Sequence, residues 1–172
     1  MNLTLFIVVL VIGLITLGTL FIPKTTQTTV EIRFDAPIDA VWEVYTDFES
    51  QPSWRSDVVS VQLSEDQQSW TETLKKSKMT IHFQIVEKSP PNRLIMKSEA
   101  AGRFEGRYIA EFRQEGKETV GIFTEEATTH GVFSKVMRFL FFNSHKFIEE
   151  YAAESKVEMK RREADQSHKK TQ

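Results

Sequence analysis

The chain has 172 residues, with 22 Lys and Arg against 24 Asp and Glu, and its formal net charge is −2. The length suits one domain with an appendage, and the charge balance argues against a nucleic-acid partner, because neutralising phosphates requires a surplus of clustered cations. The chain has no cysteine, which excludes disulfides, thiolate metal ligands and a cysteine nucleophile.

Residues 3–22 (LTLFIVVLVIGLITLGTLFI) form an apolar run without a charge. At about 1.5 Å per residue, a helix of this length spans about 30 Å, the hydrocarbon thickness of a bilayer. A cleaved signal peptide is the main alternative, but no basic residue precedes the run, the run is too long, and residues 21–24 are a poor cleavage site. A buried core helix is a second alternative, but such a helix would have no polar face, since its least apolar residues are Gly and Thr.

We therefore expect residues 1–24 to hold a single-pass transmembrane anchor, which would place the protein at the cell membrane. Lys24 is the only basic residue close to the run and lies on its C-terminal side. Basic residues are enriched on the cytoplasmic side of membrane spans, so we expect the domain that follows to be cytoplasmic.

Residues 23–27 are polar and predict a short tether between the anchor and this domain. Apolar and polar residues alternate over 29–34, which predicts a strand. Pro37 suits the first turn of a helix, because its missing N–H costs nothing there, and apolar residues at helical spacing continue to Tyr45. Residues 47–54 end this helix and leave room for one more short turn.

After Trp54 the apolar residues recur with a period of two, separated by turn signals such as Pro90-Pro91-Asn92 and Gly116. This pattern predicts further strands at 57–63, 69–74, 79–85, 93–98, 103–113 and 118–128.

Gly131 then opens a long helical pattern, which predicts one continuous C-terminal helix. Its apolar stripe consists of Phe133, Val136, Met137, Leu140, Phe147, Ile148 and Tyr151. Residues 139–142 are apolar nearly all round, which predicts burial on two sides or contact with lipid. The end of the helix interleaves cations with carboxylates and predicts a solvated surface, and residues 164–172 predict a polar, frayed tail.

A run of strands followed by a helix indicates an α+β fold. We expect a curved antiparallel sheet of six to seven strands, with the C-terminal helix across its concave side. Two apolar surfaces lined with bulky aromatic residues would face each other there and could leave a cavity between them.

The order of these elements resembles that of the START-like, Bet v 1-like (SRPBCC) superfamily, in its polyketide cyclase/dehydrase-like branch. The matching motifs are Ala36-Pro37 leading to Val41-Trp42, Thr46-Asp47-Phe48, Pro52-Ser53-Trp54, Phe104-Glu105-Gly106, Gly116 with Glu118-Thr119-Val120, Thr124-Glu125-Glu126, and the phenylalanine-rich last helix. The resemblance implies a helix-grip domain over about residues 25–163. It also implies a hydrophobic ligand, such as a lipid, sterol or polyketide, in a cavity under the last helix; some members are enzymes and others are binding modules.

On this resemblance, the residues expected to line the cavity are Trp54, Phe83, Phe104, Tyr108, Phe112, Phe123, Glu125, Phe133 and Met137. An ordinary dry core is the alternative for most of these aromatic residues, and Trp42 and Tyr45 are expected to pack. Tyr108 stands out because a buried phenol requires a polar partner and could offer one to a ligand.

Glu125 and Glu126 are adjacent on a predicted strand, so their side chains lie on opposite faces and one can face the cavity. A carboxylate in apolar surroundings can act as a general base, as cyclase or dehydratase chemistry would require. The alternative is one solvated glutamate and one that pairs with Arg103 or Arg107.

Metal, nucleotide and serine-nucleophile sites have no support in the sequence. The four histidines lack ligand spacing, and neither a phosphate-binding glycine loop nor a G-x-S-x-G elbow is present. We therefore expect no metal and no cofactor. The first functional hypothesis is a membrane-anchored module that binds a hydrophobic or lipid-like small molecule. The alternative is a cyclase or dehydratase that uses a cavity glutamate; a third possibility is a protein–protein adaptor that uses residues 139–142.

Overall fold

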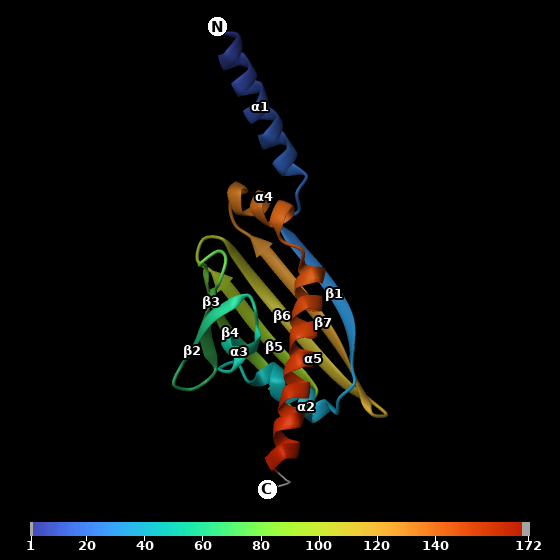
Figure 1. Ribbon diagram of the computed structural model, residues 1–172. Helices are drawn as coiled ribbons and strands as arrows, with labels where there is room; N and C mark the ends of the chain where they lie inside the picture. Colours follow the sequence, from blue (N-terminus) through green and yellow to red (C-terminus); the bar gives the residue numbers. More distant parts are fainter. Residues whose placement is uncertain (1, 170–172) are drawn as a thin grey trace.

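The computed structural model describes residues 2–169 (Figure 1). Within residues 2–20, side chains are described only for residues 2–7, 9, 10, 13 and 18. The elements in chain order are α1 (Leu3–Leu20), β1 (Thr25–Phe34), α2 (Ile38–Thr46), α3 (Gln51–Trp54), β2 (Val58–Leu63), β3 (Ser69–Leu74), β4 (Thr80–Ser89), β5 (Arg93–Ala100), β6 (Phe104–Glu115), β7 (Glu118–Thr129), α4 (Val132–Phe141) and α5 (Ser144–Lys169).

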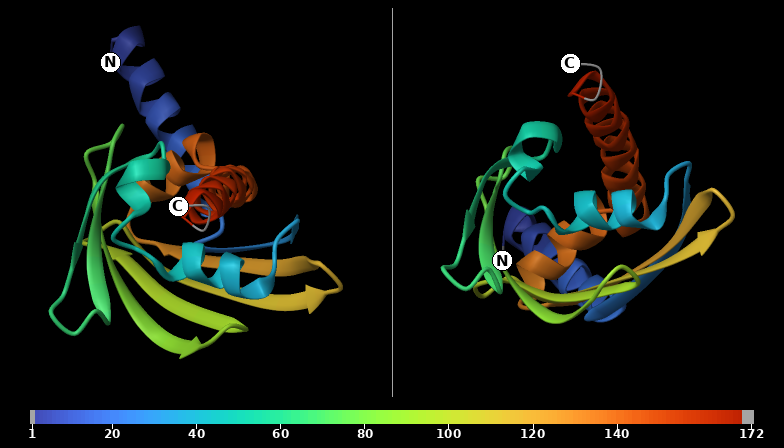
Figure 2. Two further views of the ribbon diagram at one scale, coloured as in Figure 1. Left: turned by 60° about the horizontal axis from the view of Figure 1, so that its bottom comes forward. Right: turned by 90° about the horizontal axis from the view of Figure 1, so that it is seen from below.

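The strands form one seven-stranded sheet in the order β1-β7-β6-β5-β4-β3-β2, and every neighbouring pair is antiparallel. The sheet curves around α5, which runs along its concave side, while α2 and α3 lie beside α5 (Figure 2). The expected α+β class, the curved antiparallel sheet and the helix across it are confirmed.

The predicted tether is wrong for most of its length. Residues 25–27 belong to β1, where they pair with residues 126–128 of β7. The side-chain oxygens of Thr25 and Thr128 lie 3.0 Å apart across the two strands. Threonine is β-branched and suits a pleated surface, so this polar stretch extends the strand.

The predicted single C-terminal helix is also wrong, because the chain leaves the helical conformation at Phe142 (φ −118°, ψ 122°). The side-chain oxygen of Asn143 then accepts a hydrogen bond of 3.0 Å from the backbone N–H of Lys146 and caps the start of α5. At its other end α5 continues to Lys169, so residues 164–169 are helical; residues 170–172 lie outside the described part.

Within the part of the chain that the structure describes, no helix combines the length and hydropathy of a membrane span. The anchor expected at residues 3–22 includes side chains that lie outside that part.

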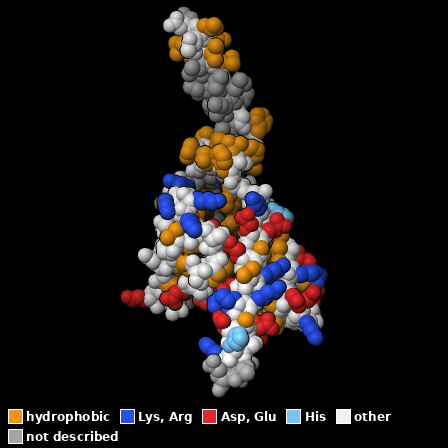
Figure 3. All heavy atoms as spheres, viewed as in Figure 1, with side chains coloured by type: hydrophobic (Ala, Val, Ile, Leu, Met, Phe, Trp, Pro, Cys, Tyr) orange, Lys and Arg blue, Asp and Glu red, His pale blue; other side chains and the backbone are white. Residues whose placement is uncertain are grey.

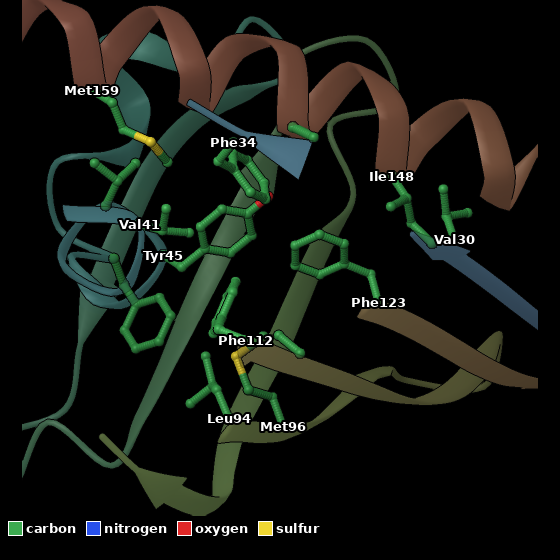
Figure 4. Packing of buried hydrophobic residues seen from close by; sticks show 14 of the residues in the cluster. Val30, Phe34, Val41, Tyr45, Leu94, Met96, Phe112, Phe123, Ile148 and Met159 are labelled. Atoms are coloured by element: carbon green, nitrogen blue, oxygen red, sulfur yellow. The ribbon is translucent and has the colours of Figure 1, made fainter. Parts of the chain in front are cut away.

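The core lies between α5, α2 and the concave face of the sheet (Figure 4). Phe34, Val41 and Phe123 are fully buried there. Gly121 makes room for two of these rings, because a Cβ atom at this position would lie 2.7 Å from Cζ of Phe123 and 3.0 Å from Cε2 of Phe34. The missing side chain allows the rings to pack directly against the backbone of β7.

Candidate functional site

Aromatic rings fill the middle of the space between α5 and the sheet. Tyr45 stacks on Phe123 with ring centroids 5.1 Å apart, and it meets the rings of Phe34, Phe112 and Tyr151 at 5.8, 5.2 and 5.1 Å. Phe112 and Phe123, which were expected to line a cavity, therefore lie inside a packed cluster (Figure 4).

A hollow of about 480 Å³ lies instead at the end of the concave face where α4 crosses it. We call it the α4 hollow. Its volume falls in the range of small-molecule sites, about 300–1,000 Å³. Its lining is mixed: the apolar part consists of Ile22, Pro23 and residues 139–142, and the polar part consists of Thr26, Thr28, Thr129, Lys135, Arg138 and residues 143–145.

The polar side comes from the concave face of β1 and the inner side of α4. In β1 the alternation that buries Val30 and Phe34 also turns Thr26 and Thr28 inward, whereas Gln27 and Thr29 are exposed. The hydroxyls of Thr26 and Thr28 thus lie on the same face of β1 as its buried core residues, at the end of the strand that borders the α4 hollow.

Arg138 is the central cation of this end, and its side chain is only 16% exposed. Its Nη2 donates to the hydroxyl of Ser144 at 3.0 Å and contacts Glu125 Oε1 at 3.4 Å, and its Nε lies 3.4 Å from the hydroxyl of Thr26. The guanidinium also lies over the ring of Phe142, at 4.7 Å from the centroid. One arginine therefore joins β1, β7, α4 and the start of α5.

Glu125 faces the concave side, on the strand position opposite Tyr108 of β6. Its partner is Arg138. No salt bridge joins Glu125 or Glu126 to Arg103 or Arg107 among the described residues, so the pairing expected for one of the two glutamates is wrong. Its Oε2 is buried and has no hydrogen-bond partner among the described residues. Burial raises the pKa of Tyr108 well above its ordinary value, so that phenol stays protonated. The two side chains therefore bring an acceptor and a donor to the same face.

The remaining residues expected in the cavity are spread over the molecule. Trp54 meets Tyr151 edge-on at 5.5 Å, beside a second hollow of about 290 Å³ between α3 and α5. Phe83 stacks on Trp70 at 5.1 Å, and Phe104 is half-buried at the start of β6. Phe133 and Met137 lie on the outer side of α4, where Phe133 is 77% exposed.

A buried ion pair that was not predicted from the sequence joins α3 to β3. Nη1 of Arg55 donates to Glu72 Oε2 at 3.0 Å and to the side-chain oxygen of Gln51 at 2.7 Å, and the side chains of Arg55 and Glu72 are 5% and 4% exposed. The indole N–H of Trp70 donates to Glu72 Oε1 at 3.0 Å. The available signal was the spacing of Trp70 and Glu72, since residues two apart on a strand share one face.

The comparisons with known proteins agree with this architecture. A conserved protein from Geobacillus kaustophilus superposes with a TM-score of 0.64 at 14% identity, covering 79% of this chain and 96% of that one. A START superfamily protein from Mycobacterium smegmatis gives a TM-score of 0.62 at 9% identity, covering 78% and 97%. Norcoclaurine synthase from Thalictrum flavum, in complex with dopamine and hydroxybenzaldehyde, gives 0.62 at 13%, covering 77% and 85%.

At these identities the structural likenesses establish the fold alone. The search of curated proteins finds no match to the chain. Residues 25–151, however, match the family described as polyketide cyclase / dehydrase and lipid transport. The match covers more than half of the chain and starts at the first residue of β1. The chain therefore belongs to the polyketide cyclase / dehydrase and lipid transport family.

Proposed function

We propose that this protein is a membrane-anchored module that binds a hydrophobic, lipid-like small molecule in the α4 hollow. The observation that carries the proposal is the mixed lining of that hollow. Residues 139–142 offer apolar contacts, while Thr26, Thr28 and Arg138 offer hydrogen-bond donors in the same hollow. This combination suits an amphipathic ligand with oxygen acceptors at one end.

The proposed site differs from the one expected under the last helix, because packed rings occupy that space. It lies instead where α1 and β1 meet α4, and α1 contacts α4. The proposal takes residues 3–22 as the membrane anchor, from their length and lack of charge, and takes the domain as cytoplasmic from Lys24. Anchoring would raise the local concentration of a ligand dissolved in the bilayer.

Native mass spectrometry of the detergent-extracted full chain tests the proposal. We expect a lipid-sized adduct on the unmodified protein. The variant Thr28→Trp places a large ring in the α4 hollow. We expect it to weaken ligand binding about tenfold or more, equivalent to at least ~1.4 kcal/mol, and so to lower the adduct fraction. Thr29→Trp is the matched control, because Thr29 is the next residue of β1 and points to the exposed face.

Two results would argue against the site. An unmodified protein that carries no adduct contradicts ligand binding, and equal adduct loss in both tryptophan variants contradicts its placement in the α4 hollow.

An enzyme of the cyclase or dehydratase type is the second candidate, and the unpartnered Oε2 of Glu125 favours it. In this role Glu125 would take a proton from the substrate while Tyr108 orients it. Loss of a general base typically lowers a rate by about 10²–10⁴-fold. Glu125→Gln would then lower turnover of a bound polyketide-like substrate by this factor without loss of the adduct, whereas Glu126→Gln, on the opposite face, would leave turnover intact.

A further inference from the structure

Helix α4 presents apolar residues to the outside, whereas its two charged residues, Lys135 and Arg138, line the α4 hollow. None of its residues is buried, and Phe133 and Phe141 are 77% and 74% exposed. Arg138, in contrast, points inward to Glu125 and Ser144. A helix on a water-exposed surface normally has the opposite arrangement, with its apolar side on the core. The other exposed apolar side chains of α4 are Val132, Met137, Phe139 and Leu140.

The same end of the molecule carries a set of exposed cations. Thr129, at the end of β7, pairs with Phe104 at the start of β6, and Phe104 pairs with Ala100 at the end of β5. His82, near the start of β4, pairs with Glu99, near the end of β5. The β3–β4 and β5–β6 turns therefore lie at the α4 end of the sheet, and Figure 3 shows lysine and arginine side chains next to the apolar surface of α4. The exposed cations of these two turns are Lys75, Lys76, Lys78 and Arg103.

No salt bridge joins these four cations to another described residue, so they are available to external anions. Four carboxylates are exposed near α4: Glu99, Glu105, Glu149 and Glu150. The last three already contact His130, His145 and Lys146 at 3.3, 3.2 and 3.5 Å. The cations therefore outnumber the unpaired carboxylates around α4. An apolar helix beside cations complements a surface with an acyl interior and anionic headgroups.

We propose that α4 docks on an anionic lipid bilayer, with its outer side among the acyl chains and the four cations on the lipid phosphates. A ten-residue helix is about 15 Å long and cannot span a bilayer, but it can lie in the interface. Since residues 139–142 also form one wall of the α4 hollow, docking brings that wall to the lipid surface. The proposal rests on the membrane location proposed above and not on ligand binding.

Single-cysteine labelling of the full chain tests the docking, because the natural sequence has no cysteine. An environment-sensitive nitrobenzoxadiazole probe is attached at Phe141→Cys on α4 and, as a matched control, at Val157→Cys on α5, where Val157 is 69% exposed. The labelled proteins are reconstituted in phosphatidylcholine vesicles that contain phosphatidylglycerol. We expect lipids brominated in their acyl chains to quench the probe at position 141 and leave the probe at position 157 unaffected.

The cations are tested by Lys→Gln changes at 75, 76 and 78. Each basic residue near an anionic surface contributes roughly fivefold to binding, so this triple variant weakens the docking equilibrium by up to about 100-fold. The matched control is Lys→Gln at 88, 117 and 160, three exposed lysines away from the α4 end. We expect quenching at position 141 to fall in the first variant only, and to fall with added salt.

Three results would overturn the docking proposal. The first is that brominated lipids do not quench the probe at position 141, with or without phosphatidylglycerol, or that the protein does not float with vesicles. The second is quenching that is equally strong with and without phosphatidylglycerol and equally strong in the two triple variants. The third is shielding of the probe without lipid that increases with protein concentration, which would assign the surface to a second copy. Quenching without a native mass-spectrometric adduct would leave docking standing and refute ligand binding.

Discussion

Arg55 and Glu72 place opposite charges inside the molecule at positions where water cannot solvate either one. The guanidinium is satisfied by Gln51, Asp57 and Glu72 and lies 5.0 Å from the ring centroid of Tyr151. Such a pair stabilises a fold only while every partner is present, because the desolvation cost of each charge is comparable to their attraction. The network fixes how α3 and α5 sit on β3.

Glu72→Gln is therefore expected to destabilise the fold by roughly 1.5–3 kcal/mol, because it removes the buried carboxylate and leaves Arg55 with only the partly exposed Asp57 as its counter-ion. Urea unfolding followed by circular dichroism measures the free energy of unfolding. Glu87→Gln is the control, since Glu87 contacts Arg93 at 3.8 Å on the surface and such pairs contribute about 0–1 kcal/mol. Similar losses in the two variants would show that the buried pair has no special role.

The directions of some side chains could be predicted from the sequence, whereas their ion-pair partners could not. The opposite directions of Glu125 and Glu126 follow from the period of a strand, and Tyr45 is buried as packing would require. The pairing of Glu125 with Arg138 did not follow, because it depends on where α4 folds back over the sheet. No local pattern encodes that contact between elements.

Among the elements, the strands were predictable and the helix break was not. Period-two alternation over 103–113 predicted β6 within two residues of its observed bounds. The apolar residues on either side of Phe142 share one helical stripe, and the break depends on the extended backbone at Phe142 and the cap at Asn143. Periodicity predicts which residues share a face of a helix, but it does not predict where the helix ends.

Helix α5 is held to α2 by Arg162, which donates to Asp47 Oδ2 at 2.7 Å and to Glu158 Oε1 at 2.7 Å. Hydrogen bonds from Arg161 and Arg162 hold the pKa of the Glu158 carboxyl below its ordinary value. A carboxyl whose pKa is lower in the folded state stabilises the fold above its unfolded pKa. That contribution is lost as the pH falls through the folded pKa.

Glu158→Gln should therefore reduce the acid sensitivity of the fold. The unmodified protein loses more stability than the variant as the pH falls from about 5 toward 3, around and below the ordinary glutamate pKa of about 4.3. Thermal unfolding at a series of pH values measures this difference, with Glu149→Gln as a control on the exposed side of α5. Parallel pH curves for the unmodified protein and Glu158→Gln would refute the role of this carboxyl.

The whole molecule is divided along its length into a packed end and an open end. Near α2, aromatic rings and the Arg162 network close the space between α5 and the sheet. Near α4, threonine hydroxyls, Arg138 and an exposed apolar helix surround the α4 hollow, and α1 joins the domain at the same end (Figure 1). A lipid-like ligand would therefore enter and leave beside α1 and would not cross the core.

Photo-crosslinking in membranes tests this ligand site most directly. A benzoylphenylalanine is placed at Thr26, which lines the α4 hollow, or at Gln27, the next residue of β1, which is exposed. After irradiation of membranes that contain the full chain, mass spectrometry identifies any lipid-like molecule bonded to the residue. We expect a defined adduct at position 26 and none at position 27; no adduct at position 26, or the same adducts at both positions, would contradict ligand binding in the α4 hollow.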